Sequence, residues 1–390
     1  MGTSLPENYA PTLPGQLREA GYFTALLGKA HFRPCLDPHS FEAAPNIHDL
    51  DFFRRWTGPF HGFEHVKLVI GHTSEPHASG MHYGAWLADQ GVSLKDYFGI
   101  HRYDQYGRWS LPQQFHGSRW VADETIAAMD MAARRGKPFF LWASFQDPHN
   151  PYVTPEPWDS MYRPGDVPLP QRFEGETQGK PPFYPSLMAG QFYGKDDPDL
   201  QFRGGGDCKI RPELRDDDIR QLWAAYYGMI SLMDFHIGRI LAELERRGLM
   251  SNTLIVFTTD HGDYLGSHGL WGKGLPTYEE MQRIPFIVRH PRCATPGRRS
   301  AALQSLVDIE ATCLAAAGLP QPPLSQGVSQ DAAWRDASVR ARDWAMLEFR
   351  PAQTPFMQRT FITDRHKLVL YRQRPYGELY DLLEDPNQLT

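Results

Sequence analysis

Hydrophobic positions near the start of the chain follow first a helical and then a strand-like spacing. Leu13 and Leu17 recur at helical spacing. Thr12 is a suitable N-cap for this helix, and Gly21 suits the position just after its last turn. Residues 22–27 then form a short apolar run, typical of a buried strand. A helix followed so closely by a strand predicts one repeat of a parallel α/β layer.

The same alternation continues through the middle of the chain. Residues 121–135 regain helical spacing, and the apolar run 139–145 predicts a fully buried strand. The longest helical pattern begins at the acidic residues 216–218, which suit a helix N-terminus, and ends at Gly248. Three further predicted elements follow: strands at 253–258 and 286–289 and a helix near 305–317.

Two stretches rich in Gly and Pro, residues 34–118 and 148–212, show weak periodicity and are predicted to be loops with short elements. From about residue 335, short strands joined by tight turns predict a small antiparallel subdomain. We therefore expect an α/β fold with a central, mostly parallel sheet flanked by helices, followed by a C-terminal antiparallel α+β subdomain. The expected domains are 1–334 and 335–390.

Composition narrows the class of protein. The 390 residues are 41% hydrophobic and 22% charged, with a net charge of −6, so the chain can bury a large core. A mildly acidic chain is not an expected partner of nucleic acid, and no apolar run is long enough to cross a membrane. The sequence does not indicate the oligomeric state. Localisation stays open between cytoplasm and periplasm, because any signal peptide would precede Met1.

Candidate metal chemistry lies directly after the predicted strand 253–258. Asp260 and His261 stand side by side, and a carboxylate beside an imidazole suits a divalent metal with mixed oxygen and nitrogen ligands. Lys273 follows twelve residues later between two glycines, where a fixed cation can neutralise an anionic oxygen. The alternative is a polar turn with Asp260 as a cap and Lys273 as a solvated loop residue.

Two other predicted strands end in similar residues. Lys29 and His31 follow the strand 22–27, and His149 follows the strand 139–145 within Asp-Pro-His-Asn-Pro. An imidazole in such a rigid frame suits a general acid. Each histidine alone is as compatible with a structural role. Together, three strand ends that each carry Lys, His or Asp predict one anion-binding pocket at a sheet edge.

These segments resemble the sulfatase family of the alkaline phosphatase superfamily, in which arylsulfatases and phosphonate monoester hydrolases are the most similar members. The resemblance runs in family order through nearly the whole chain and is carried by residues 11–31, 145–151, 252–263, 307–309 with 317–319, and 377–386. It implies a sulfuric ester hydrolase that acts on a small sulfate ester.

The resemblance also implies roles for single residues. Asp260 and His261 would bind a divalent metal ion, with Ca²⁺ favoured over Mn²⁺ or Mg²⁺. Lys29 and Lys273 would bind the sulfate oxygens. In the same scheme, His31 would lie near the nucleophile and His149 would assist departure of the alcohol oxygen.

One family motif has no counterpart in this sequence. Sulfatases carry Cys-x-Pro-x-Arg, whose Cys becomes formylglycine, and neither Cys35 nor Cys293 has Pro and Arg at the required places. Cys208 and Cys313 are likewise expected to be structural thiols. The expectation is a truncated chain without its nucleophile segment and inactive by itself.

Two alternatives stay open. The same scaffold could hydrolyse a phosphonate monoester or a phosphodiester. His261 favours the branch of the family that includes phosphonate monoester hydrolases and related sulfatases, because some other relatives have Asn at this position. A non-catalytic pseudoenzyme is the second alternative.

Five histidines lie within 22 residues, namely His61, His65, His72, His77 and His82. They lack an HExxH motif and predict a polar, substrate-facing segment rather than a zinc site.

Overall fold

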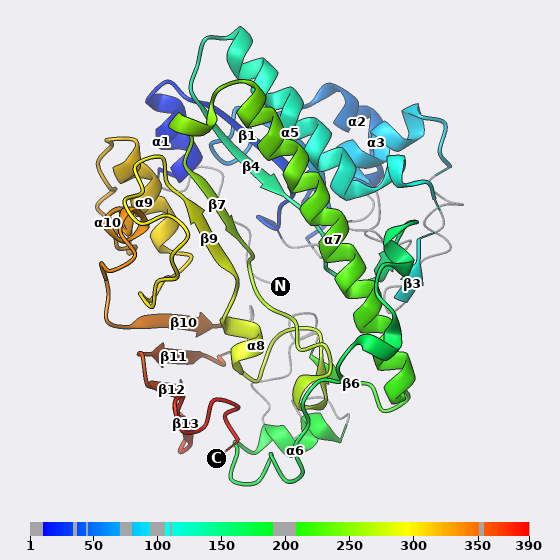
Figure 1. The fold of residues 1–390 in the computed structure, drawn as a ribbon, viewed down its shortest axis with the longest axis vertical. Helices are drawn as coiled ribbons and strands as arrows, with labels where there is room; N and C mark the ends of the chain where they lie inside the picture. Colours follow the sequence, from blue (N-terminus) through cyan, green and yellow to red (C-terminus); the bar gives the residue numbers. More distant parts are fainter. Residues whose placement is uncertain are drawn as a thin grey trace. The chain divides into compact units, whose positions relative to one another are not determined.

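The computed structural model of the chain is shown in Figure 1. It describes residues 11–33, 37–43, 46–70, 80–93, 106–109, 111–189, 208–350 and 355–389. The chain forms two compact units, each assembled from separated stretches of sequence. The N-terminal unit comprises Thr3–Leu169 and Arg215–Met250, and the C-terminal unit comprises Pro170–Leu214 and Ser251–Thr390.

A three-stranded parallel sheet forms the centre of the N-terminal unit. Its order is β2 (His65–Val69), β1 (Phe23–Lys29) and β4 (Phe139–Ser144). Gly28 of β1 lies opposite Ser144 of β4, and a Cβ atom on Gly28 would lie 1.8 Å from the Ser144 carbonyl oxygen. The close approach of these two strand ends therefore requires glycine at position 28. The parallel sheet predicted from the sequence is confirmed.

Helices cover this sheet. The helices that lie against it are α1 (Leu13–Glu19), α2 (Leu50–Arg55), α3 (Met81–Asp89) and α5 (Gly117–Arg134). The long helix α7 (Asp216–Arg246) packs on α5 and on the short strands β3 (Tyr106–Arg108) and β5 (Tyr152–Thr154), which pair in parallel. Thr12 caps α1 as predicted, accepting a hydrogen bond from the Gly15 backbone nitrogen at 3.2 Å. Ala128 and Ala132 of α5 pack against Phe23 of β1. Figure 1 shows α7 running beside α5, and the two helices are in contact.

The region 34–118, predicted to hold loops and short elements, contributes the five-residue strand β2 to the sheet. One prediction for this unit is wrong. The strand β4 was expected to be fully buried, but its side chains are half-buried and Trp142 is 46% exposed. Its apolar composition matched a central strand, whereas β4 lies at the end of the described strand order.

The C-terminal unit contains β7 (Ile255–Thr258), which pairs antiparallel with β9 (Phe286–Arg289). Its other elements before the last sheet are α6 (Phe183–Met188), β6 (Lys209–Ile210), β8 (Leu270–Trp271), α8 (Glu279–Gln282), α9 (Asp308–Ala316) and α10 (Asp331–Arg335). The predicted strands near 255 and 286 and the helix near 308 are thus present. Within the described ranges, every helix is too short or too polar to span a bilayer.

The predicted antiparallel sheet at the end of the chain is confirmed. It has the order β10 (Ala345–Phe349), β11 (Gln358–Ile362), β12 (His366–Tyr371) and β13 (Gly377–Asp381), drawn in orange to red in Figure 1. Strand β12 alternates exposed and buried side chains, as expected when one face packs on a core. The strand β13 was not predicted from the sequence. The domain boundary at 334/335 stays a prediction.

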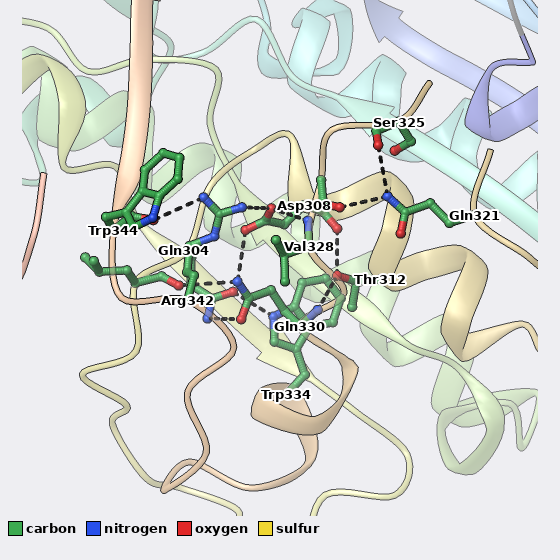
Figure 2. Close-up of polar contacts among 12 residues, drawn as sticks. Gln304, Asp308, Thr312, Gln321, Ser325, Val328, Gln330, Trp334, Arg342 and Trp344 are labelled. Carbon is green, nitrogen blue, oxygen red and sulfur yellow. Dashed lines mark hydrogen bonds and ion pairs between the residues drawn. The ribbon is translucent and has the colours of Figure 1, made fainter. Parts of the chain in front are cut away.

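A buried carboxylate connects α9 with the segment before the last sheet (Figure 2). Asp308 is 1% exposed and accepts hydrogen bonds from the Val328 backbone nitrogen and Gln330 Nε2, both at 2.9 Å. Arg342 donates to the same carboxylate. Because a buried carboxylate is costly unless it is fully paired, this network fixes the chain around α9. The Val-Asp-Ile segment that resembles the sulfatase pattern thus has a structural role.

Candidate active site

The turn after β7 places Asp260 and His261 next to each other. Asp260 Oδ1 accepts hydrogen bonds from the His261 backbone nitrogen at 3.1 Å and from Thr259 Oγ1 at 3.2 Å. The other carboxylate oxygen, Oδ2, lies 3.5 Å from His261 Nε2. Asp260 is largely exposed, while His261 is more buried. The two predicted metal ligands therefore come together on one short turn.

Gly262 fixes this turn against α8. Its backbone nitrogen donates to the Met281 carbonyl oxygen at 3.0 Å. A Cβ atom at position 262 would lie 1.7 Å from the Glu280 carbonyl oxygen, so no other residue fits without a backbone shift. The glycine after the Asp-His pair is thus required by close packing.

A second carboxylate, which sequence reasoning missed, brings Lys273 to this turn. Asp263 Oδ1 accepts from the backbone nitrogens of Leu265 at 3.0 Å and Gly272 at 3.2 Å, closing the loop between them. Gly272 and Gly274 flank Lys273 with φ values of +77° and +116°, which favour glycine. Asp263 was visible in the sequence as the next acidic residue, but its backbone partners were not.

Lys273 and His261 are in direct contact. Lys273 Nζ donates to His261 Nε2 at 3.1 Å, and His261 Nδ1 lies 2.7 Å from the Gly262 carbonyl oxygen. A carbonyl oxygen can only accept, so the neutral ring carries its proton on Nδ1 and keeps a lone pair on Nε2. This is the tautomer that a metal-binding histidine needs, because the carbonyl oxygen orients the ring and fixes the ligating nitrogen.

The residues present suit part of a metal shell. Asp260 Oδ2 and His261 Nε2 are close enough for both to reach one ion at ordinary ligand distances. Among the residues that the structure describes, no group of three or more His, Cys, Asp or Glu side chains is placed to hold a metal ion. The pair thus offers two ligands, one oxygen and one nitrogen.

In the N-terminal unit, Lys29 is the last residue of β1 and His31 follows it. His31 Nδ1 lies 2.7 Å from Glu42 Oε2. The other oxygen of Glu42 accepts from the backbone nitrogens of Phe32 at 3.0 Å and Arg33 at 3.3 Å. Glu42 was not singled out in the sequence, since it lies in a region predicted to be irregular.

His149 lies in the loop after β4. Its backbone nitrogen donates to the Gln146 carbonyl oxygen at 3.0 Å, and its Nδ1 lies 2.8 Å from the Asn150 carbonyl oxygen. The adjacent Asp147 is buried and accepts a hydrogen bond from Ser118 Oγ at the N-terminus of α5. The base of this loop is therefore attached to α5 as well as to β4.

The structure groups the predicted site residues in two sets. Because β1 and β4 are parallel neighbours, Lys29 at the end of β1, His31 just after it and His149 after β4 belong to strands that end at the same sheet edge. Asp260, His261 and Lys273 form the other set, in the C-terminal unit. That both sets line one pocket stays a prediction.

Within the histidine-rich segment, His82 has a structural role. His82 is 3% exposed; it accepts from the Leu68 backbone nitrogen at 2.9 Å, and its Nε2 lies 2.7 Å from the Trp56 carbonyl oxygen. Burial lowers the pKa of His82 to about 3 and that of His65 to about 4. The prediction of a substrate-facing role is therefore wrong for His82. His72 and His77 lie outside the described residues, as does Cys35.

Comparisons with known proteins agree with this fold. The family model "Sulfatase" matches residues 2–319, and "N-sulphoglucosamine sulphohydrolase, C-terminal" matches residues 266–390. The chain is 26% identical to an arylsulfatase of Clostridium perfringens, over 98% of this chain and 74% of the relative. It is 30% identical to the multifunctional alkaline phosphatase superfamily protein PehA of Trinickia caryophylli, over 70% of this chain and 51% of that protein.

Among solved structures, the phosphonate monoester hydrolase SpPMH from Silicibacter pomeroyi matches with a TM-score of 0.74 and 25% identity. That match covers 97% of this chain and 75% of the other. Fold and comparisons together define a hydrolase of the alkaline phosphatase superfamily. Within that superfamily the chain belongs to the sulfatase family, whose members act on sulfate esters.

Proposed function

We propose that this chain provides the metal-binding, anion-binding and leaving-group residues of a site that hydrolyses a small sulfate ester. The observation that supports this proposal most directly is the contact of Lys273 Nζ with His261 Nε2 at 3.1 Å, beside the Asp260 carboxylate. A fixed ammonium group next to a carboxylate–imidazole pair is suited to hold a divalent cation and an anionic ligand together.

Asp260 and His261 would hold the cation. The ion we propose is Ca²⁺, with Mn²⁺ or Mg²⁺ as alternatives, and oxygen ligands in addition to this pair would complete its shell. A bound cation supplies Lewis-acid chemistry, which withdraws charge from a sulfate oxygen. The Gly262 carbonyl oxygen holds the His261 proton on Nδ1. The lone pair of Nε2, which accepts from Lys273 Nζ in this structure, would bind the ion once the ammonium group turns to a sulfate oxygen.

The remaining residues act on the substrate. Lys29 and Lys273 bind sulfate oxygens and stabilise the charge that develops on them. His149 donates a proton to the departing alcohol oxygen, and His31 lies near the attacking group. The sequence contains no Cys-x-Pro-x-Arg motif that could yield formylglycine. We therefore expect the 390-residue chain to bind sulfate but not to turn over sulfate esters.

Calorimetric titration with inorganic sulfate in the presence of CaCl₂ tests this proposal. Lys273→Ala should weaken sulfate binding roughly tenfold or more, because a hydrogen bond to a charged group contributes about 1.5–3 kcal/mol. Lys137→Ala, at a surface lysine paired with Glu64, is the matched control and should leave sulfate affinity unchanged. Equal sulfate affinity in Lys273→Ala and the unaltered chain would refute the anion-binding role.

Turnover is tested separately with an aryl sulfate. The 390-residue chain should release phenol no faster than a buffer blank, with or without Ca²⁺. Robust metal-dependent turnover by this chain would overturn the expectation that the nucleophile is missing from it.

Phosphonate monoester hydrolysis is the second candidate, and the structural match to SpPMH at TM-score 0.74 favours it. Titration with phenyl phosphonate against inorganic sulfate ranks the two candidates. A clear preference for the phosphonate would replace the sulfate proposal. Binding of neither anion would favour a non-catalytic protein.

A further inference from the structure

The buried carboxylate of Glu42 contacts three consecutive residues that come shortly after Lys29 in the sequence, namely His31, Phe32 and Arg33. Glu42 Oε2 lies 2.7 Å from His31 Nδ1, and Glu42 Oε1 accepts from the backbone nitrogens of Phe32 and Arg33 at 3.0 and 3.3 Å. The Glu42 side chain is 3% exposed, while that of His31 is 41% exposed. The arrangement is thus a buried acceptor that holds an accessible imidazole.

The loop that carries Glu42 is itself held in place. The Glu42 backbone nitrogen donates to Ser40 Oγ at 3.0 Å. The preceding residue, Phe41, packs on Phe52 and Trp56. Its ring centroid lies 5.3 Å from that of Phe52 and 5.1 Å from that of Trp56. Each aromatic pair of this kind adds about 0.5–1.5 kcal/mol beyond simple burial. The position of the carboxylate is therefore set by the hydrophobic core of the unit.

The hydrogen-bond pattern determines which nitrogen of His31 carries the proton. Both oxygens of an ionised carboxylate only accept, and Oε1 already takes two backbone hydrogen bonds. Oε2 therefore needs a donor, and in a neutral ring that donor is Nδ1–H. The second nitrogen, Nε2, is then a hydrogen-bond acceptor.

We propose that Glu42 is a positioning residue that fixes His31 in the Nδ1–H tautomer, so that Nε2 can accept a hydrogen bond from a hydroxyl group at the reacting centre. This inference rests on the proposed function for the place of His31, but the tautomer itself does not. A carboxylate behind a histidine is a common way of setting ring orientation and basicity at functional sites.

The direct test is long-range ¹H–¹⁵N NMR of the full chain at about pH 8.5, well above the ordinary histidine range. The His31 signals are assigned by their loss in His31→Asn. In the unaltered chain, Nδ1 should be protonated and Nε2 should not. The opposite tautomer would overturn the proposal, and this measurement requires no change at Glu42.

Glu42→Gln should invert the tautomer. Its amide oxygen can still accept from Phe32 and Arg33, so the NH₂ group faces His31 Nδ1, which must then accept and leave the proton on Nε2. Glu64→Gln, at a glutamate paired with Arg135, is the matched control and should leave the His31 signals unchanged. An unchanged tautomer in folded Glu42→Gln would contradict the proposal.

Sulfate binding gives a second readout that a merely structural role would not produce. At about pH 8.5, Glu42→Gln should bind inorganic sulfate several-fold more tightly than the unaltered chain, because Nε2–H becomes a donor and a negative charge is removed. Weaker or equal binding would overturn the link between Glu42 and the anion site. If the unaltered chain binds no sulfate, the proposed function fails, whereas the NMR result still decides whether Glu42 sets the tautomer.

Discussion

At the residue scale, Gly262 should tolerate an added methyl group poorly. In Gly262→Ala, the new Cβ atom would overlap the Glu280 carbonyl oxygen, so the turn must shift. Such overpacking typically lowers the free energy of unfolding by about 1–3 kcal/mol. Because Asp260 and His261 share this turn, Ca²⁺ affinity should fall as well. Urea unfolding and Ca²⁺ titration measure the two effects.

The control for this prediction is Gly238→Ala in α7, where an added Cβ atom meets nothing within 4 Å. That variant should be slightly more stable, because alanine favours a helix over glycine by about 1 kcal/mol. Equal stability of Gly262→Ala and the unaltered chain would show that the turn is not packed as described.

His82 predicts a pH dependence of stability. Burial lowers its pKa to about 3, against 6.5 for an ordinary histidine, so between these values the unfolded chain binds a proton that the folded chain does not. Stability should therefore fall as the pH drops from 6.5 toward 3. His82→Gln, which keeps a donor and an acceptor, should reduce the slope by about 1.4 kcal/mol per pH unit. Urea unfolding at several pH values checks this, and an unchanged slope would contradict it.

Single residues differ in how far the sequence could identify them. Asp260 and His261 were predictable as a pair because they adjoin in sequence, and Lys273 because glycines flank it. Asp263 and Glu42 were missed, since each acts through backbone nitrogens up to ten residues away. The sequence shows where a carboxylate stands, but it does not show which backbone nitrogens the folded loop brings to it.

At the scale of elements, long periodic patterns were the most predictable. α7 extends over Asp216–Arg246, close to its predicted limits, because apolar residues recur through its whole length. β2 was missed since its five residues, His65–Val69, include polar His65 and Lys67 and lie in a region rich in Gly and Pro. A short strand depends on its neighbours in the sheet, which local pattern does not contain.

The N-terminus of α5 supports the loop that carries His149. Ser118 Oγ donates to the buried Asp147 carboxylate, so Ser118→Ala leaves a charged oxygen short of a donor. We expect a loss of about 1–3 kcal/mol in the free energy of unfolding. Ser160→Ala, which removes a hydrogen bond at an exposed site, should cost less than about 0.5 kcal/mol. Equal losses in the two variants would argue against a supporting role for Ser118.

At the scale of the whole molecule, the two units alternate along the chain. α7 belongs to the same unit as β1 and β4, although residues 170–214 of the other unit separate it from them in sequence. A sequence pattern is read in order and favours contiguous domains, which is why the prediction was 1–334 followed by 335–390. Discontinuous units arise from long-range packing, which periodicity cannot detect.

Lys367 connects the last sheet to the segment behind the Asp260 turn. It is fully buried on β12, and burial lowers its pKa. Its Nζ donates to the Thr277 carbonyl oxygen, to Gln388 Oε1 at 2.7 Å and to Glu279 Oε1 at 3.3 Å. The segment that it holds continues to Met281, whose carbonyl oxygen accepts from the Gly262 backbone nitrogen at 3.0 Å.

Lys367→Met should therefore loosen the Asp260 turn from a distance. Removing one member of a buried charged network costs about 3–5 kcal/mol, since the remaining acceptors stay buried without their donor. Hydrogen exchange should accelerate at β12 and at the Gly262 amide, but not at β1 of the N-terminal unit. Arg365→Met, which removes an exposed ion pair with Asp381, is the control and should leave the Gly262 amide unchanged. Uniform acceleration in both units would instead mean that they unfold as one cooperative body.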